Sequence, residues 1–169
     1  MKKIFVTVCA AAIALGFASC KKEEQSKLDL GAFSGKAVVK GQVSYNSGYF
    51  KDASDGNKEY YDYYKPAANQ TLIIELLNEG GEVIKSETIT TDGNGMYSVE
   101  LPATENVALE AYIQVQFEAT KTLAPVGDEA PKTQQCQFTG TAFEDLYPNQ
   151  TGIGNIKIAT SIVITPDLN

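Results

Sequence analysis

Alternating apolar and polar residues dominate this chain after about residue 35. The clearest stretch is residues 109–117, where apolar side chains occupy every second position and Glu, Tyr or Gln fill the positions between. A period of two is typical of a β-strand with one buried face. Residues 72–77 are instead apolar on both faces, which suits a strand in the middle of a sandwich.

Turn residues separate these stretches, and no segment shows a helical period with convincing caps. Strands are predicted at residues 39–45, 72–77, 83–90, 96–101, 109–117, 134–138 and 153–164. The clearest turn is at residues 91–95. Pro102 is expected to end the strand at residues 96–101. About seven strands with turns between them predict an all-β, Ig-like Greek-key sandwich.

Part of this pattern resembles a known family. Residues 39–45, residues 67–77 and the run Thr91-Asp92-Gly93-Asn94-Gly95-Met96-Tyr97 are similar to the carboxypeptidase-regulatory or transthyretin-like domain over about residues 37–119. The resemblance implies a seven-stranded Greek-key sandwich that serves as an accessory or adhesive module and carries no catalytic set. The long insertion between Tyr45 and Ala67 departs from the family pattern and lies where a binding loop is expected.

The first residues predict export. Lys2 and Lys3 precede an apolar run at residues 4–17, which is 14 residues long (17 − 4 + 1). A membrane-spanning helix needs about 20 apolar residues. A basic start, a short apolar run and small residues after it are the layout of a secretory signal.

Phe17-Ala18-Ser19-Cys20 resembles the processing box of bacterial lipoproteins, with Phe17 in a position that looks like lipoproteins of the Bacteroidota. The resemblance implies that the Cys20 thiol receives a diacylglyceryl group and that the new amine is acylated, for example with palmitate. Two or more acyl chains give stable membrane attachment. The alternative is that Cys20 is an ordinary residue near the cleavage site of a secreted protein.

Lys22, Glu23 and Glu24 resemble the short signal that sends Bacteroidota lipoproteins to the cell surface, although a solvated charged linker has the same composition. The expected organisation is a signal peptide at residues 1–19, a lipidated Cys20 with a tether to residue 35, and a sandwich at residues 36–169. The expected location is the outer membrane, lipid-anchored and exposed at the cell surface.

Composition removes several classes of function. All 14 basic residues are Lys, and the chain has no Arg and no His, so it lacks a His-based nucleophile system and any imidazole metal ligand. The formal net charge is −7, and it becomes −9 (12 − 21) once residues 1–19 are removed. A negative chain is repelled by a nucleic-acid backbone, so no nucleic-acid partner is expected.

No cofactor or metal site is predicted. Residues 52–59 carry oxygen ligands but do not match an EF-hand loop, and a polar turn explains them, as it explains Asp92 and Asn94. Cys136 alternates in phase with Phe138 and is expected to be a small buried side chain. No catalytic residue is predicted.

The candidate ligand-binding residues form a tyrosine cluster inside the insertion. They are Tyr49, Tyr60, Tyr61, Tyr63 and Tyr64. Tyrosine has a flat apolar face and a polar tip, so such a cluster is able to stack on sugar rings or anchor a partner protein. The alternative is a β-hairpin extension in which tyrosine is favoured by strand propensity.

The sequence therefore predicts a non-catalytic binding or assembly module, held to membrane lipid through Cys20, whose partner is an envelope protein or a glycan. A glycan-binding lipoprotein that uses the tyrosine cluster is the first alternative. A carboxylate-based enzyme acting on glycans is the second, because two acids flanking a cleft are sufficient for that chemistry.

The processing box makes one direct prediction. The native protein purified from its membrane should have 150 residues (169 − 19) and begin at Cys20, with the mass of a diacylglyceryl group and an N-acyl chain on its first residue. Mass spectrometry of the amino-terminal peptide measures this. Any other first residue, or an unmodified Cys20, contradicts lipid anchoring.

Overall fold

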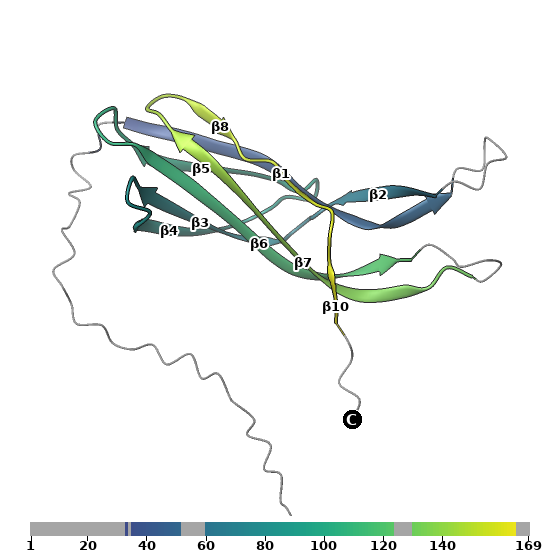
Figure 1. The fold of residues 1–169 in the computed structure, drawn as a ribbon. Coiled ribbons are helices and arrows are strands. Elements are labelled where there is room, and N and C mark those ends of the chain that lie inside the picture. Colours follow the sequence, from purple (N-terminus) through teal and green to yellow (C-terminus); the bar gives the residue numbers. More distant parts are fainter. Residues whose placement is uncertain (1–32, 34, 52–59, 124–129, 165–169) are drawn as a thin grey trace, which may run out of the picture.

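Ten β-strands form the described part of the chain, and no helix lies among these residues (Figure 1). The computed structural model describes residues 33, 35–51, 60–123 and 130–164. The strands are β1 (Gly35–Lys51), β2 (Tyr60–Pro66), β3 (Thr71–Asn78), β4 (Val83–Thr90), β5 (Met96–Ala103), β6 (Leu109–Thr122), β7 (Thr133–Leu146), β8 (Thr151–Ile153), β9 (Ile156–Ile158) and β10 (Ile162–Val163). The predicted all-β sandwich class is confirmed.

The strands form two layers that share a long first strand. One layer contains β4, β3, β6, β7 and β10 in that spatial order, with antiparallel neighbours. In the other layer, the first half of β1 pairs with β5 and β8, and its second half pairs with β2 and β9. The layers join where Gly48 of β1 pairs with Thr122 of β6.

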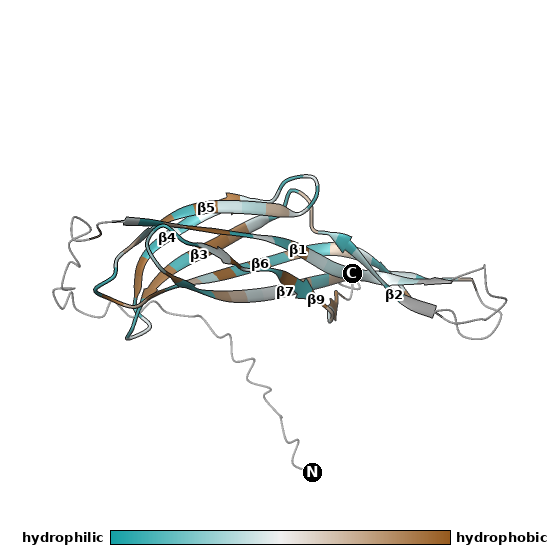
Figure 2. Ribbon diagram, turned by 90° about the horizontal axis from the view of Figure 1, so that it is seen from above, coloured by the Kyte–Doolittle hydropathy of each residue, from teal (hydrophilic) through white to brown (hydrophobic). Residues whose placement is uncertain are grey.

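The alternation in the sequence becomes the core between the layers, and Figure 2 shows it as bands along the strands. On β6 the residues at 109, 111, 113, 115 and 117 are buried and those between them are not, as predicted. On β3, Leu72, Ile74 and Leu76 are completely buried. Each such aliphatic side chain stabilises the fold by about 1.5–3 kcal/mol relative to exposure.

Two predicted strand boundaries differ from the structure. Pro102 does not stop its strand, because β5 continues to Ala103 and pairs Pro102 with Lys36. Among the described residues β5 pairs only with β1, and an edge strand tolerates a residue without an N–H. The strand predicted at residues 134–138 runs over the whole of Thr133–Leu146, because every residue of it pairs with β6.

The strand predicted at residues 153–164 is divided into three short strands. Together with β2, this division raises the number of strands in the described residues from the predicted seven to ten. β8 and β9 run parallel to β1, whereas β10 pairs with β7 in the other layer. The break between β8 and β9 falls at Gly154, whose backbone lies against Gly41 of β1 and the ring of Tyr97. The interruption therefore follows from close packing at one point on β1.

The predicted turn at residues 91–95 is present, and it connects the two layers because β4 pairs with β3 and β5 pairs with β1. Asp92 Oδ1 accepts the backbone N–H groups of Asn94 and Met96, both at 2.8 Å. The buried Thr91 hydroxyl donates to the Ala67 carbonyl oxygen at 2.6 Å. The two Asp92 bonds satisfy the turn locally, as the polar-turn interpretation of Asp92 expected, and the Thr91 bond connects the turn to Ala67.

The insertion after Tyr45 forms an antiparallel hairpin of β1 and β2, which extends beyond the body of the sandwich (Figure 1). The hairpin interpretation of this segment is confirmed for its backbone. The buried Asn46 side chain accepts the Gly48 N–H at 2.9 Å, and the Ser47 hydroxyl donates to the Tyr63 carbonyl oxygen at 3.1 Å. These bonds hold a bulge at the base of the hairpin.

Several predictions fall outside the described residues. They concern the signal peptide at residues 1–19, the lipidation of Cys20, the export signal Lys22, Glu23 and Glu24, and the polar segment at residues 52–59. Within the described ranges, no helix has the length and apolar character that crossing a bilayer requires.

Because β1 closely approaches the break between β8 and β9, a methyl group added at Gly41 is expected to destabilise the fold. A Cβ at position 41 would lie 2.7 Å from the Gly154 carbonyl carbon and 3.0 Å from Tyr97 Cε1. Gly41→Ala should therefore lower the free energy of unfolding by about 1–3 kcal/mol, measured by urea denaturation. Gly93→Ala is the matched control, because a Cβ there meets no heavy atom within 4 Å. Equal effects of the two substitutions would contradict this packing.

Candidate functional site

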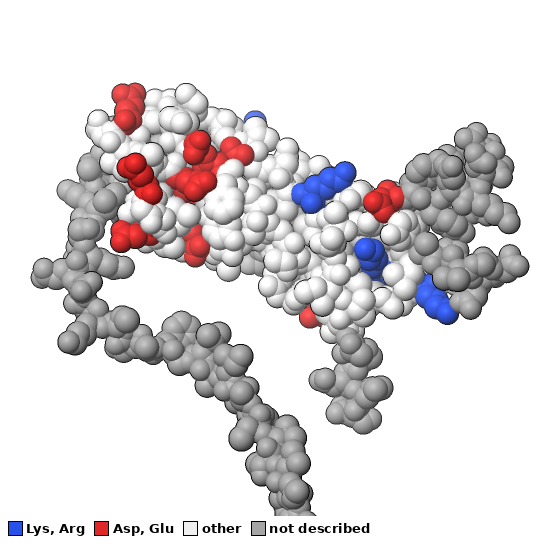
Figure 3. Space-filling view, in the orientation of Figure 1, with Lys and Arg blue, Asp and Glu red and all other residues white. Residues whose placement is uncertain are grey.

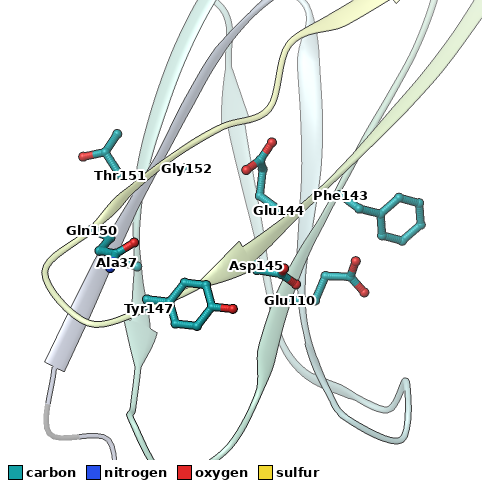
Figure 4. A pocket seen from close by; sticks show the side chains of 9 residues that line it. All are labelled: Ala37, Glu110, Phe143, Glu144, Asp145, Tyr147, Gln150, Thr151 and Gly152. Carbon is teal, nitrogen blue, oxygen red and sulfur yellow. The ribbon is translucent and has the colours of Figure 1, made fainter.

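A pocket of about 370 Å³ lies at the end of the sandwich where β1 begins (Figure 4). The end of β7 and the segment leading into β8 supply most of its wall. The lining residues are Ala37, Glu110, Phe143, Glu144, Asp145, Tyr147, Gln150, Thr151 and Gly152. Three of them are acids and none is a lysine, so the pocket is negatively charged.

Two stacked aromatic rings lie on the outer face of the sheet, and one of them, Phe143, lines this pocket. Tyr112 of β6 lies opposite Phe143 of β7, and their ring centroids are 4.5 Å apart with an angle of 19° between the planes. Phe143 keeps 54% of its surface exposed although it is a large apolar side chain. Tyr147, just beyond the end of β7, is 55% exposed and lines the same pocket.

Carboxylates flank the aromatic pair of Tyr112 and Phe143 on the same face. Glu110 and Asp145 form the cross-strand pair two residues along from Tyr112 and Phe143, and Figure 4 shows their side chains close together. Like charges directly opposite across a strand pair are destabilising. On the other side, Glu75 lies opposite Tyr112 and accepts a hydrogen bond of 3.1 Å from the Gln114 amide.

Glu144 lines the pocket and lies near the core residue Tyr97, whose pKa it affects. Glu144 is half-buried and lies against Gly152 and Gly154. The Tyr97 hydroxyl donates to the Gly154 carbonyl oxygen. Burial, and after it the negative charge of Glu144, raise the pKa of Tyr97 to about 12. Tyr97 therefore stays protonated and keeps this hydrogen bond at neutral pH.

Figure 3 shows a wider charge pattern on one face. Acidic side chains gather over the end that contains the starts of β1 and β6, and lysines lie toward the hairpin end. The pocket belongs to the acidic end, because Ala37 near the start of β1 lines it. The acidic lining would therefore repel an anionic ligand.

The predicted tyrosine cluster is placed on the hairpin but does not form one surface. Tyr49 pairs with Asp62, so Tyr49 and Tyr64 lie on one face of the hairpin, and Tyr63 lies on the other. Tyr49 is 37% exposed and Tyr63 is 47% exposed. Tyr60 and Tyr61 belong to β2, and their side chains lie outside the described part of the structure.

Lysine side chains accompany two of these tyrosines. Lys157 Nζ of β9 lies 4.1 Å from the centre of the Tyr64 ring, and Lys65 Nζ lies 5.7 Å from that of Tyr63. Asp62 Oδ1 accepts a 3.1 Å hydrogen bond from the Asn46 amide. The contact of Lys157 with Tyr64 attaches the hairpin to β9, and the other two lie within the hairpin. Ligand binding by the tyrosines stays a prediction.

The remaining sequence candidates have structural roles. Cys136 is 1% exposed in the core, which confirms the prediction that its thiol is buried. In the part of the chain that the structure describes, no three His, Cys, Asp or Glu residues are arranged to hold a metal ion.

Sequence reasoning missed the pocket and the aromatic pair. The alternation does place Tyr112 and Glu110 on the outer face of their strand. Their partners, Phe143 and Asp145, lie beyond the strand predicted at residues 134–138, so the signal for this surface was incomplete. Only the pairing of β6 with β7 brings the four side chains together.

Comparison with known proteins defines no family. No family model and no curated protein matches the chain. Among the solved structures distantly similar to this chain are three with 14% sequence identity each. A candidate carbohydrate-binding protein from Pseudomonas aeruginosa has a TM-score of 0.43 over 73% of this chain and 88% of its own. The major plantain pollen allergen Pla l 1 has a TM-score of 0.41 over 79% and 99%.

The third structure is a candidate polysaccharide-binding protein from Bacteroides thetaiotaomicron, with a TM-score of 0.36 over 71% of this chain and 46% of its own. This chain therefore spans less than half of that protein. Similarity at this level assigns no ligand, and the resemblance of residues 37–119 to the transthyretin-like domain stays an expectation.

Because the pKa of Tyr97 is raised, its contribution to the free energy of unfolding should depend on pH in alkaline solution. Tyrosines of the unfolded chain ionise near pH 10, whereas folded Tyr97 ionises at about 12, so its contribution is complete below about pH 10 and is lost as the pH rises toward 12. Tyr97→Phe should lower the free energy of unfolding by about 1 kcal/mol near pH 8, because the Gly154 carbonyl loses its donor.

Urea denaturation of both proteins at about pH 8 and about pH 11 measures this dependence. The advantage of the wild type over Tyr97→Phe should shrink at the higher pH. An advantage that stays constant or grows would contradict the assigned pKa.

Proposed function

We propose that this protein is a non-catalytic lipoprotein of the outer membrane, anchored through Cys20 and exposed at the cell surface, that acts as a binding or assembly module. The processing box at residues 17–20 and the export signal at residues 22–24 support the anchor and the location. The absence of His from the whole sequence and the burial of Cys136 support binding over nucleophilic chemistry.

The geometry of β1 is the single observation that carries this proposal. The strand begins at Gly35, where the proposed tether ends, and continues into the tyrosine-bearing hairpin at Lys51. Its 17 residues, at about 3.3 Å each, span roughly 50 Å. One continuous strand therefore separates Gly35, the residue at which the proposed tether joins the sandwich, from the hairpin.

The hairpin is the proposed docking element for an envelope protein or a glycan. Tyr49 and Tyr63 present partly exposed rings on its two faces. Tyrosine is enriched at protein interfaces and binds sugar rings because one side chain offers both apolar area and a hydroxyl. The hairpin bonds of Asn46 and Ser47 hold these rings on a fixed backbone.

A glycan-active enzyme is the second candidate, and Glu110 and Asp145 are the two carboxylates that it would use. Glycosidases use two carboxylates that flank the bond to be broken. Here both residues project from the same face of adjacent strands, so they would contact the same side of a sugar. This arrangement suits binding better than hydrolysis.

Purification of the native lipoprotein from its own membrane tests the proposed function. A specific protein or glycan should co-purify with the wild type, and Tyr49→Ala combined with Tyr63→Ala should lower its recovery at least about tenfold. A tenfold loss corresponds to about 1.4 kcal/mol, within the range of an interface aromatic.

The control for that experiment is Met96→Ala, which removes an exposed apolar side chain from β5 outside the hairpin. Recovery with this variant should match the wild type. If nothing co-purifies, or if the tyrosine variants retain the partner in full, the proposed role of the hairpin is wrong. Turnover of a bound glycan would favour the enzyme.

A further inference from the structure

We propose a second binding site, away from the hairpin, in which the outer face around Tyr112 and Phe143 and the adjacent pocket bind an uncharged glycan chain. This inference rests on the proposed function only in that both describe a binding protein. The hairpin and this site lie in different parts of the sandwich, so each is testable without the other.

The aromatic pair supplies a stacking surface that is fixed before a ligand arrives. Tyr112 is paired on both sides, with Glu75 and Phe143, and Phe143 is held in register by its pairing with Tyr112, so the nearly parallel rings brace each other. Aromatic rings prefer such offset contacts with other flat or apolar surfaces. A preorganised surface loses little side-chain freedom on binding, and this favours affinity. The C–H face of a sugar ring is a ligand of matching shape.

The polar side chains around the pair match the hydroxyl groups of a sugar. Alternate residues on a strand are about 7 Å apart, so Glu110 and Asp145 on one side and Glu75 and Gln114 on the other border the rings. Carboxylates accept hydrogen bonds and do not donate them when ionised. A ligand with many hydroxyl donors satisfies these groups and relieves the unfavourable approach of Glu110 to Asp145.

Charge narrows the class of glycan. The pocket lining contains Glu110, Glu144 and Asp145 and no lysine, so a sulfated or uronic chain would be repelled. The acidic lining therefore disfavours anionic chains, and the flat Phe143 ring favours an uncharged chain of sugars over a cationic ligand.

The backbone argues against an extended peptide over β3 and β6. Both strands have paired neighbours on each side, so around Glu75, Tyr112 and Gln114 this face offers side chains only, whereas β7 beside Phe143 is paired with β6 alone among the described residues. Extended peptides are usually recognised through main-chain hydrogen bonds to an open sheet edge. A sugar chain needs no such pairing.

The pocket extends the stacking surface beyond the aromatic pair. Phe143 belongs to both, because it stacks on Tyr112 and lines the pocket. Tyr147 provides a further exposed ring, and the side chains of Gln150 and Thr151 add both hydrogen-bond donors and acceptors. A chain of several sugars is therefore able to contact Phe143 and Tyr147 together, and affinity should rise with chain length.

Isothermal titration of the full mature chain in detergent tests this site. The probes are neutral hexasaccharides of β-linked glucose, mannose and xylose, an anionic hexagalacturonate and a cationic hexalysine. At least one neutral hexasaccharide should bind with a Kd of about 1 mM or tighter, and its trisaccharide more weakly. The galacturonate should not bind.

Substitutions identify the surface. Phe143→Ala and Phe143→Leu should each weaken binding of the neutral hexasaccharide at least about tenfold. Both variants lack the flat ring, although Leu keeps apolar volume. Met96→Ala, at a similarly exposed apolar position on β5, should bind as the wild type does. Tyr49→Ala with Tyr63→Ala should also leave this titration unchanged, so failure of the hairpin and failure of this site are distinguishable.

Three outcomes overturn the proposal. The first is that no neutral hexasaccharide binds the wild type. The second is that Phe143→Leu retains full affinity, since stacking is then not involved. The third is that hexalysine binds more tightly than every sugar and loses that affinity in Phe143→Ala, which would make the surface a site for cationic peptides.

Discussion

The close approach of Gly41 on β1 to Gly154 is the contact on which the rest of the structure depends. It allows β8 and β9 to follow one another along the same edge of β1, with the Tyr97 ring packed against both glycines. The Tyr97 hydroxyl satisfies the Gly154 carbonyl at the point where strand pairing stops. A buried carbonyl without a donor is costly, so this bond and the small residues together make the crossing possible.

Because β1 is shared, the molecule has two ends with different chemistry. The start of β1 contributes Ala37 to the acidic pocket, and its far end carries Tyr49 on a hairpin bordered by lysines. The two proposed binding surfaces therefore differ in charge and lie toward opposite ends of β1.

The fold followed from the sequence wherever one face of a strand is uniformly apolar. The alternation at residues 109–117 placed the buried residues of β6 correctly. It failed for the end of β7, because the inward positions after Phe138 hold Gly140, Ala142 and Glu144, and so the apolar signal fades. Pairing with β6 keeps those residues extended. The prediction that Pro102 ends β5 failed because propensity does not reveal which strand lies at an edge.

The sequence by itself determined the sandwich class, the burial of Cys136, the polar turn at Asp92 and the lack of His-based chemistry, because each depends on local pattern or on composition. The tertiary structure alone decided that Tyr49 and Tyr63 lie on opposite faces and that Tyr112 stacks on Phe143 beside a pocket. These arrangements depend on strand register. A shift by one residue moves every side chain to the other face, and no local signal fixes the register between distant strands.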